Sequence, residues 1–243
     1  MEEAAKRIII CGFDKVEQHI KYSNIGLICV VMPGISEEID YGSVPVLDCY
    51  HHGIYKSDDS ILALEAKNQV ENNLETIANF LNEDPNKNIL IHCNAGMHRS
   101  PPFAAMVLLY LQGNKPDIYK AMGAVQKISQ NACLGSIQDY KTLLDVSKEE
   151  LEQIILDYFL VKHIRNGLLR GEGFETSFQN AKNFFNPVPS KKSAIDAYRK
   201  FNLDLPTDTA LCDADNDPQE HTPSLPRTPV SRANPHMGRD GPS

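Results

Sequence analysis

The chain of 243 residues is long enough for one domain with appendages or for two small domains. Hydrophobic residues make up 42% and charged residues 23% of it, which excludes a wholly disordered or collagen-like chain. The formal net charge of -8 argues against a broad surface for nucleic acid or anionic lipid. No apolar run approaches the roughly 20 residues that a membrane helix needs. We therefore expect a cytoplasmic protein, with export into a host cell left open.

Six cysteines are scattered along the chain, at positions 11, 29, 49, 93, 133 and 212. They form neither a Cys-x-x-Cys pair nor the Cys/His spacing of a zinc site. This pattern predicts no metal centre and no disulfide scaffold, and we expect no cofactor. It directs attention to thiol chemistry at a single position.

Short and nearly continuous apolar segments in the first half are typical of buried parallel strands. They cover residues 7–11, 26–32, 43–47 and 88–92. Between the last two segments, apolar residues recur at helical spacing from near Ser60 until Asp84-Pro85. The alternation predicts an α/β fold, with a central and mostly parallel sheet of four to five strands flanked by helices.

Helical patterns dominate the rest of the chain. Residues 101–112 have proline in their first turn and Gly113 after their end, an asymmetry typical of helices. Ser147 and Glu150 form an S-x-x-E capping box, which predicts a new helix over 147–163. Further helices are predicted over 117–129, over 136–146 and, as two weaker patterns divided by Asn-Pro-Val-Pro, within 174–201.

The composition divides the chain into three regions. Residues 1–146 carry the strands and the first helices, and residues 147–205 form a predicted helical extension. No aromatic residue follows Phe201, and seven of the fifteen prolines fall from Pro206 onward. Residues 206–243 are therefore predicted to be a disordered, Pro-rich tail, which could dock a partner.

The strongest motif lies between the strand at 88–92 and the following helix. Residues 91–102 read Ile-His-Cys-Asn-Ala-Gly-Met-His-Arg-Ser-Pro-Pro, which contains H-C-x5-R-S. A loop curled over a helix N-terminus directs backbone N–H groups inward, and the helix dipole adds partial positive charge. Gly96 lets the loop turn, and the planar fork of Arg99 can hold two phosphate oxygens. The pattern predicts a socket for a tetrahedral dianion.

Cys93 is the predicted nucleophile at the base of this socket. The field that binds phosphate also stabilises a thiolate, and attack on phosphorus would give a thiophosphoryl enzyme. His92 could brace the loop, and the Ser100 hydroxyl could donate to the thiolate when it leaves. The predicted phosphate-binding loop consists of Asn94, Ala95, Gly96, Met97 and His98.

The motif resembles that of the cysteine-dependent phosphatase superfamily, in particular its dual-specificity and tyrosine phosphatase-like members. His92, Cys93, Gly96, Arg99 and Ser100 carry the resemblance, together with Ala95, and it extends over roughly residues 7–146. It implies a tyrosine phosphatase-like fold and a phosphoprotein substrate. The implied activity is hydrolysis of phosphotyrosine, with phosphoserine and phosphothreonine as further candidates.

The family also uses an aspartic acid, on a loop that follows a strand, to protonate the leaving oxygen. Asp48 fits that position because it ends Val-Pro-Val-Leu-Asp as the chain leaves a predicted strand. Asp58 and Asp59 are the alternatives, since their interval to Cys93 is nearer to that of many dual-specificity members. With Ser60 they also fit a helix N-cap and an acidic first turn. We favour Asp48.

Two other functions fit parts of the same pattern. A phosphoprotein-binding adaptor, or pseudophosphatase, would keep the socket and lose the activity, although intact Cys93 and Arg99 count against it. A rhodanese-like sulfurtransferase also places a loop cysteine at a helix start. His92 before the cysteine and Arg-Ser after the loop favour the phosphatase.

Overall fold

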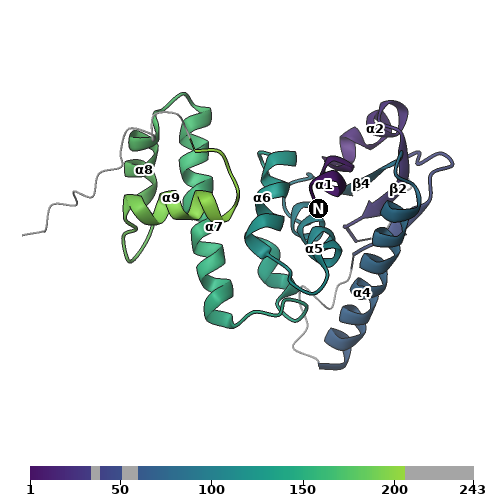
Figure 1. The fold of residues 1–243 in the computed structure, drawn as a ribbon. Helices are drawn as coiled ribbons and strands as arrows, with labels where there is room; N and C mark the ends of the chain where they lie inside the picture. Colours follow the sequence, from purple (N-terminus) through teal and green to yellow (C-terminus); the bar gives the residue numbers. More distant parts are fainter. Residues whose placement is uncertain (34–38, 51–59, 206–243) are drawn as a thin grey trace, which may run out of the picture. The chain divides into compact units, whose positions relative to one another are not determined.

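The computed structural model describes residues 1–33, 39–50 and 60–205. Its centre is a parallel sheet with the strand order β1-β4-β2-β3. The strands are β1 (Ile8–Gly12), β2 (Ile25–Val30), β3 (Val46–Asp48) and β4 (Asn88–Cys93). This arrangement confirms the predicted α/β fold with a parallel sheet flanked by helices (Figure 1).

The third strand begins later than the sequence indicated. The predicted strand started at residue 43, whereas β3 starts at Val46 and ends at Asp48. Pro45 has no N–H to donate to a ladder, and it contributes only its carbonyl, which accepts from the backbone of Ile28 at 3.0 Å. Because β3 pairs only with β2 among the described strands, Asp48 lies at the carboxyl end of an outer strand of this sheet.

Helices cover one face of the sheet. The long helix α4 (Ser60–Glu83) and the helices α5 (Ser100–Gln112) and α6 (Ile118–Ile128) supply most of the apolar side chains on this face. The nearly continuous apolar pattern of α5 is explained by its position, because its residues 100–109 are all buried. Figure 1 shows α4 and α5 beside the strands.

The opposite face is covered by shorter segments. The helix α2 (Val16–Tyr22) packs there with the chain around Ile39 and Val44, against Cys11, Ile28 and Leu90. Two further short elements flank β1, namely α1 (Glu2–Lys6) before it and the 3-10 helix η1 (Phe13–Lys15) after it. Alternate residues of each strand thus enter two separate apolar clusters, as the period of a strand requires.

The predicted helix over 136–146 is wrong. In its place stand a 3-10 helix, η2 (Gly135–Tyr140), and a series of turns. The buried side chains of Ile137 and Tyr140 are three residues apart, which matches the three residues per turn of a 3-10 helix. The tight turn also brings Gly135 against Phe159, whose ring would lie 2.7 Å from a Cβ at that glycine.

The helical extension consists of α7 (Lys148–Leu169), α8 (Phe174–Lys182) and α9 (Lys191–Lys200). The predicted cap is present, since Ser147 accepts from the N–H of Glu150 at 3.1 Å. The helix α7 continues six residues beyond the predicted end and stops before Gly171, whose φ is +84°. Figure 1 shows α8 and α9 packed on α7.

The extension is tied to the sheet region by polar and apolar contacts. Asp157 of α7 is buried and accepts from the hydroxyl of Tyr119 in α6 at 2.8 Å. It also accepts from Lys200 at 2.9 Å and from Gln153 at 2.7 Å. The largest apolar cluster runs without interruption from the sheet face into α7, α8 and α9. The division at residue 146 stays a prediction, and the predicted tail over 206–243 lies outside the described residues.

None of the helices in the described ranges combines the length and the apolar character needed to cross a membrane.

Candidate active site

The H-C-x5-R-S segment forms the loop between β4, which ends at Cys93, and α5, which begins at Ser100. Two hydrogen bonds hold the loop from outside. The N–H of Phe13 donates to the carbonyl of Asn94 at 3.1 Å, and the N–H of Cys133 donates to the carbonyl of Met97 at 2.8 Å. In a trans peptide the C=O and the next N–H point in opposite directions. Both bonds therefore turn the following N–H groups, those of Ala95 and His98, toward the inside of the loop.

Two glycines let the loop lie directly on the end of β1. Gly96 has a φ of +68°, and a Cβ there would lie 2.4 Å from the carbonyl carbon of Cys11. Across the contact, a Cβ on Gly12 would lie 3.2 Å from the carbonyl carbon of Ala95. The sequence motif predicted a role for Gly96 but not for Gly12. The only indication for Gly12 is its position directly after a predicted strand.

Cys93 is buried, with 3% of its surface exposed. Burial alone raises the pKa of a thiol, but hydrogen bonds from Ser100 and from the backbone of Arg99 and Gly96 outweigh it and lower the pKa of Cys93 below its ordinary value. The Ser100 contribution comes from both its hydroxyl and its N–H. The loop thus favours the thiolate form at the position that the sequence predicts as the nucleophile.

The two residues that follow the loop, Arg99 and Ser100, both contribute to the surroundings of this sulfur. The Ser100 hydroxyl is buried and makes no hydrogen bond of ordinary geometry among the described residues, but it lies close enough to the sulfur of Cys93 to help lower the pKa of that thiol. Arg99 is half-buried, and its guanidinium lies 5.6 Å from the centre of the Tyr50 ring. In the described part of the chain no carboxylate pairs with Arg99, which leaves its donors available for an anion.

His92 lies in the sheet, one residue before the nucleophile, and is fully buried. Its Nε2 lies 3.2 Å from the hydroxyl of Tyr41, and the two ring centres are 5.8 Å apart. Burial lowers the pKa of His92 to about 4. A neutral imidazole therefore packs under the loop, and no pattern in the sequence indicates its partner Tyr41.

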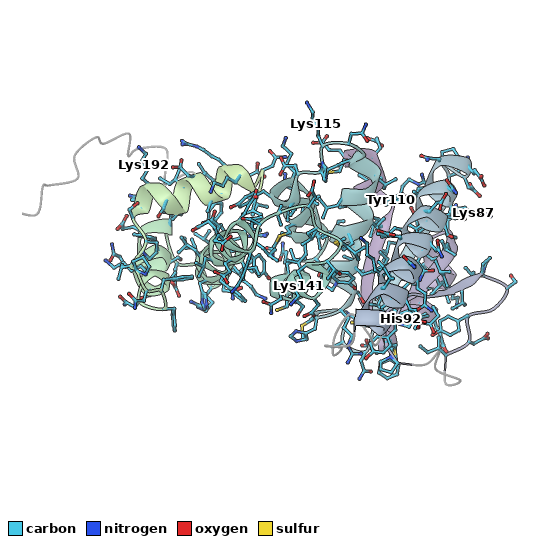
Figure 2. The ribbon with its side chains drawn as sticks, turned by 90° about the horizontal axis from the view of Figure 1, so that it is seen from below. Lys87, His92, Tyr110, Lys115, Lys141 and Lys192 are labelled. Atoms are coloured by element: carbon cyan, nitrogen blue, oxygen red, sulfur yellow. The ribbon has the colours of Figure 1, made fainter. Side chains whose placement is uncertain are left out.

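The other loop residues form the mouth of the site. Asn94, Ala95, Met97 and His98 are exposed, whereas Gly96 is buried against β1. The lysines labelled in Figure 2 belong to separate parts of the chain and do not gather beside His92. Within the motif, the backbone N–H groups, the α5 dipole and Arg99 supply positive charge.

Asp48 is exposed at the carboxyl end of β3, and its register pairs it with Val30, which in turn pairs with His92. Two strand spacings, about 10 Å, separate its backbone from β4. Its Oδ1 accepts from the N–H of Tyr50 at 3.0 Å, so Asp48 shapes the turn that carries the ring facing Arg99. No hydrogen bond in the described part links the carboxylate to the loop itself. The alternatives Asp58 and Asp59 lie outside the described residues.

No group of three or more His, Cys, Asp or Glu side chains within the described ranges is arranged to hold a metal ion.

Among solved structures, the chain is similar to tyrosine and dual-specificity phosphatase folds. Tk-PTP in its G95A mutant form is 21% identical, with a TM-score of 0.39, over 62% of this chain and 93% of its own. Human DUSP28 is 15% identical, with a TM-score of 0.41, over 58% and 94%. The human tyrosine phosphatase-like serine/threonine/tyrosine-interacting protein is 16% identical, with a TM-score of 0.41, over 57% and 93%.

No protein-family model and no curated protein matches the chain.

Proposed function

We propose that this chain is a cysteine-dependent phosphatase that hydrolyses phosphotyrosine, with phosphoserine and phosphothreonine as further substrates. One observation carries the proposal: the buried sulfur of Cys93 receives hydrogen bonds from the backbone of Gly96, Arg99 and Ser100, and its pKa is lowered despite burial. A cysteine that only fills space in a core has no need of such donors. This arrangement supports a thiolate held ready beneath an anion socket.

The same loop has the donors that a phosphoryl group requires. The N–H groups of Ala95 and His98 are turned inward, and the N-terminus of α5 lies at the end of the loop. Arg99 has no carboxylate partner among the described residues and can hold two phosphate oxygens in its fork. These donors meet the charge that develops on the equatorial oxygens during transfer.

In the proposed reaction, Cys93 attacks the phosphorus atom while the bond to the ester oxygen breaks. The proton on the Asp48 carboxyl passes to the leaving oxygen, which departs as the phenol or alcohol of the dephosphorylated protein. The Asp48 carboxylate then takes a proton from water, whose oxygen attacks the thiophosphoryl group. The S–P bond breaks, inorganic phosphate leaves, and the Ser100 hydroxyl donates to the restored thiolate.

The position of Asp48 supports its assignment as the general acid. It ends a strand at the same edge of the sheet as Cys93, and its side chain is exposed and accessible to a bound substrate. Its carboxylate holds the backbone N–H of Tyr50, whose ring lies 5.6 Å from the guanidinium of Arg99. Tyr50 would form a wall of the mouth, against which the ring of a phosphotyrosine can pack.

The direct test is hydrolysis of an aryl phosphate by the purified chain and by Cys93→Ser. We expect turnover by the wild type, a trapped phosphoenzyme after rapid acid quench, and loss of both in the variant. Peptides that carry phosphotyrosine, phosphoserine or phosphothreonine then rank the substrates. Absence of turnover by a folded wild type would overturn the proposal.

The same assays separate the competing functions. An adaptor would bind phosphopeptides without releasing phosphate, and a sulfurtransferase would move sulfur from thiosulfate to cyanide. We expect neither result. The cytoplasmic location and partner docking by residues 206–243 remain proposals that rest on the sequence.

A further inference from the structure

We infer that the helical extension is part of the catalytic apparatus, because α7 anchors the phosphate-binding loop through Tyr158. This inference rests on the proposed function and adds to it a positioning residue that lies outside the motif. Tyr158 is 65 residues beyond Cys93 in the chain, and its hydroxyl bonds to residues outside the loop. It acts through the segment Ala132–Leu134, which connects α6 to η2.

The hydroxyl of Tyr158 holds this segment from both sides. It donates to the carbonyl of Ala132 at 2.7 Å and accepts from the N–H of Leu134 at 2.9 Å. Ala132 and Leu134 are fully buried, and Tyr158 is 1% exposed. One oxygen atom therefore satisfies two backbone groups that lack access to water, which makes the link costly to break.

Other side chains of the extension support the same carbonyl. Lys162, one turn further along α7, donates to the carbonyl of Ala132 at 3.1 Å. Arg165 donates to the side-chain oxygen of Gln126, whose amide nitrogen lies 3.5 Å from that carbonyl. The side-chain hydrogen bonds to the carbonyl of Ala132 thus come from α7 itself or from an α6 side chain that α7 orients.

The segment Ala132–Leu134, which α7 holds in place, is also bonded to the predicted phosphate-binding loop. Between its two anchored neighbours, Cys133 donates its N–H to the carbonyl of Met97 at 2.8 Å. That bond fixes the peptide plane between Met97 and His98, and it turns the N–H of His98 inward. A path of consecutive hydrogen bonds therefore runs from α7 to a donor of the anion socket.

The loop has a second anchor of different origin. The bond to the carbonyl of Asn94 comes from Phe13, the first residue of η1 directly after β1, within the sheet region itself. The first half of the loop is thus fixed by the sheet, and the second half depends on the extension. Support of the second half of the loop is therefore the role that we assign to α7. The sequence alone did not indicate what this helix does.

The test compares Tyr158→Phe with Tyr198→Phe. Both substitutions remove one buried hydroxyl from the extension, but the hydroxyl of Tyr198 has no hydrogen-bond partner among the described residues. For Tyr158→Phe we expect a fall in kcat of roughly 10-fold, less than the roughly 100-fold that a displacement of about 1 Å can cost. We also expect weaker inhibition by inorganic phosphate and a rise in the pKa of Cys93, since its backbone donors loosen. Tyr198→Phe should match the wild type.

The thiol pKa is measured from the ultraviolet absorbance of the thiolate, against a Cys93→Ser background for each variant. This readout does not need turnover, so a wild type without activity overturns the proposed function and still leaves the anchor testable. A folded Tyr158→Phe with wild-type kcat, phosphate inhibition and thiol pKa overturns the inference. If Tyr158→Phe does not fold, Lys162→Met takes its place, with a shift in the same direction expected and wild-type behaviour again overturning the inference.

Discussion

Two cysteines near the ends of neighbouring parallel strands have pKa values that are shifted in opposite directions. Cys11 lies near the end of β1 and Cys93 at the end of β4, and both are buried, with 6% and 3% of their surfaces exposed. Burial, with the nearby Asp14 carboxylate as the next cause, raises the pKa of Cys11 to about 12. Burial opposes the thiolate of Cys93 as well, yet the pKa of Cys93 is lowered.

The difference lies in the chain that follows each cysteine. After Cys11 the chain passes through Gly12 into the three-residue 3-10 helix η1, and no backbone donor lowers the pKa of that sulfur. After Cys93 it curls back over the sulfur and enters the thirteen-residue helix α5. A position at the end of a strand is therefore not enough to lower the pKa of a thiol. The seven residues that follow Cys93 supply the donors that lower it.

The largest effect is expected from Arg99→Lys. This change keeps the charge but replaces the planar fork with a point donor, so kcat/KM should fall by roughly 100-fold or more. The hydrogen bond from Arg99 to the sulfur comes from its backbone, and the thiol pKa should therefore stay low. Steady-state kinetics and a thiol titration measure the two effects.

Arg170→Lys is the matched control, because Arg170 is exposed and pairs with Glu172 far along the chain from the motif. It should behave as the wild type. A fall of less than about threefold in kcat/KM for Arg99→Lys would contradict the bidentate role.

Asp48→Asn should slow turnover without changing the difference in thiol pKa between Cys11 and Cys93. Loss of a general acid costs about 100-fold in kcat, and more with a poor leaving group. The thiol pKa of Cys93 should not change, because no hydrogen bond among the described residues joins Asp48 to the loop. Phosphate release from esters with leaving groups of different acidity measures the effect.

Asp58→Asn and Asp59→Asn serve as comparisons in the same assay. Full turnover by Asp48→Asn, together with a loss in either of these two variants, would move the general acid to that residue.

Gly96→Ala tests the contact between the two strand ends. The new Cβ would lie 2.4 Å from the carbonyl carbon of Cys11, at a φ of +68°. We expect a loss of about 2 kcal/mol in unfolding free energy and a fall of roughly 10-fold in kcat, because the loop must move off β1. Urea unfolding and kinetics measure both.

Gly171→Ala separates the steric contact from the backbone strain. Gly171 also has a positive φ, of +84°, but nothing lies within 4 Å of the position that a Cβ would take there. Its alanine variant should lose less stability and keep its activity. Equal losses of stability and activity in Gly96→Ala and Gly171→Ala would show that the contact of Gly96 with β1 does not stabilise the loop.

Burial shifts the pKa of His92 without the opposing hydrogen bonds that act on Cys93. Its pKa is lowered to about 4 in the folded chain, against about 6.5 unfolded, so the unfolded state binds the proton first as the pH falls. Stability from the neutral imidazole is therefore complete above pH 6.5 and decreases down to pH 4, by about 3 kcal/mol at most. Urea unfolding at a series of pH values measures this slope.

The slope should be smaller in His92→Gln. His19 and His163, whose pKa values are also lowered by burial, remain in both proteins and cancel in the comparison. Identical pH slopes for the wild type and the variant would contradict a buried neutral His92.

The parts that the sequence predicted correctly are local. The strand at 88–92, the motif and the helix with its early prolines follow each other without a break, so one stretch of sequence defines Cys93, Arg99 and Ser100. The error at 136–146 arose where side-chain spacing fits both a 3-10 and an α-helix, and packing against Phe159 decides between them. Local pattern cannot resolve such a case.

The parts that were missed are contacts between distant segments. Gly12 at the end of β1 and Phe13 directly after it contact the loop, Tyr41 contacts His92, and Tyr158 anchors the segment that binds Met97. Nothing in the residues around these positions marks them, because each acts on a part of the chain at least 24 residues away. A single sequence does not specify such pairs, and the three-dimensional arrangement does.

The most direct measurement is a titration of the Cys93 thiol by thiolate absorbance, taken as the difference between the wild type and Cys93→Ser, with Cys11→Ala as the parallel variant. We predict that Cys93 ionises below the roughly 8.5 of a free thiol and that Cys11→Ala leaves this transition in place. A transition at or above the pKa of a free thiol in the folded protein would contradict the central claim that the loop, and not the strand end, creates the reactive cysteine.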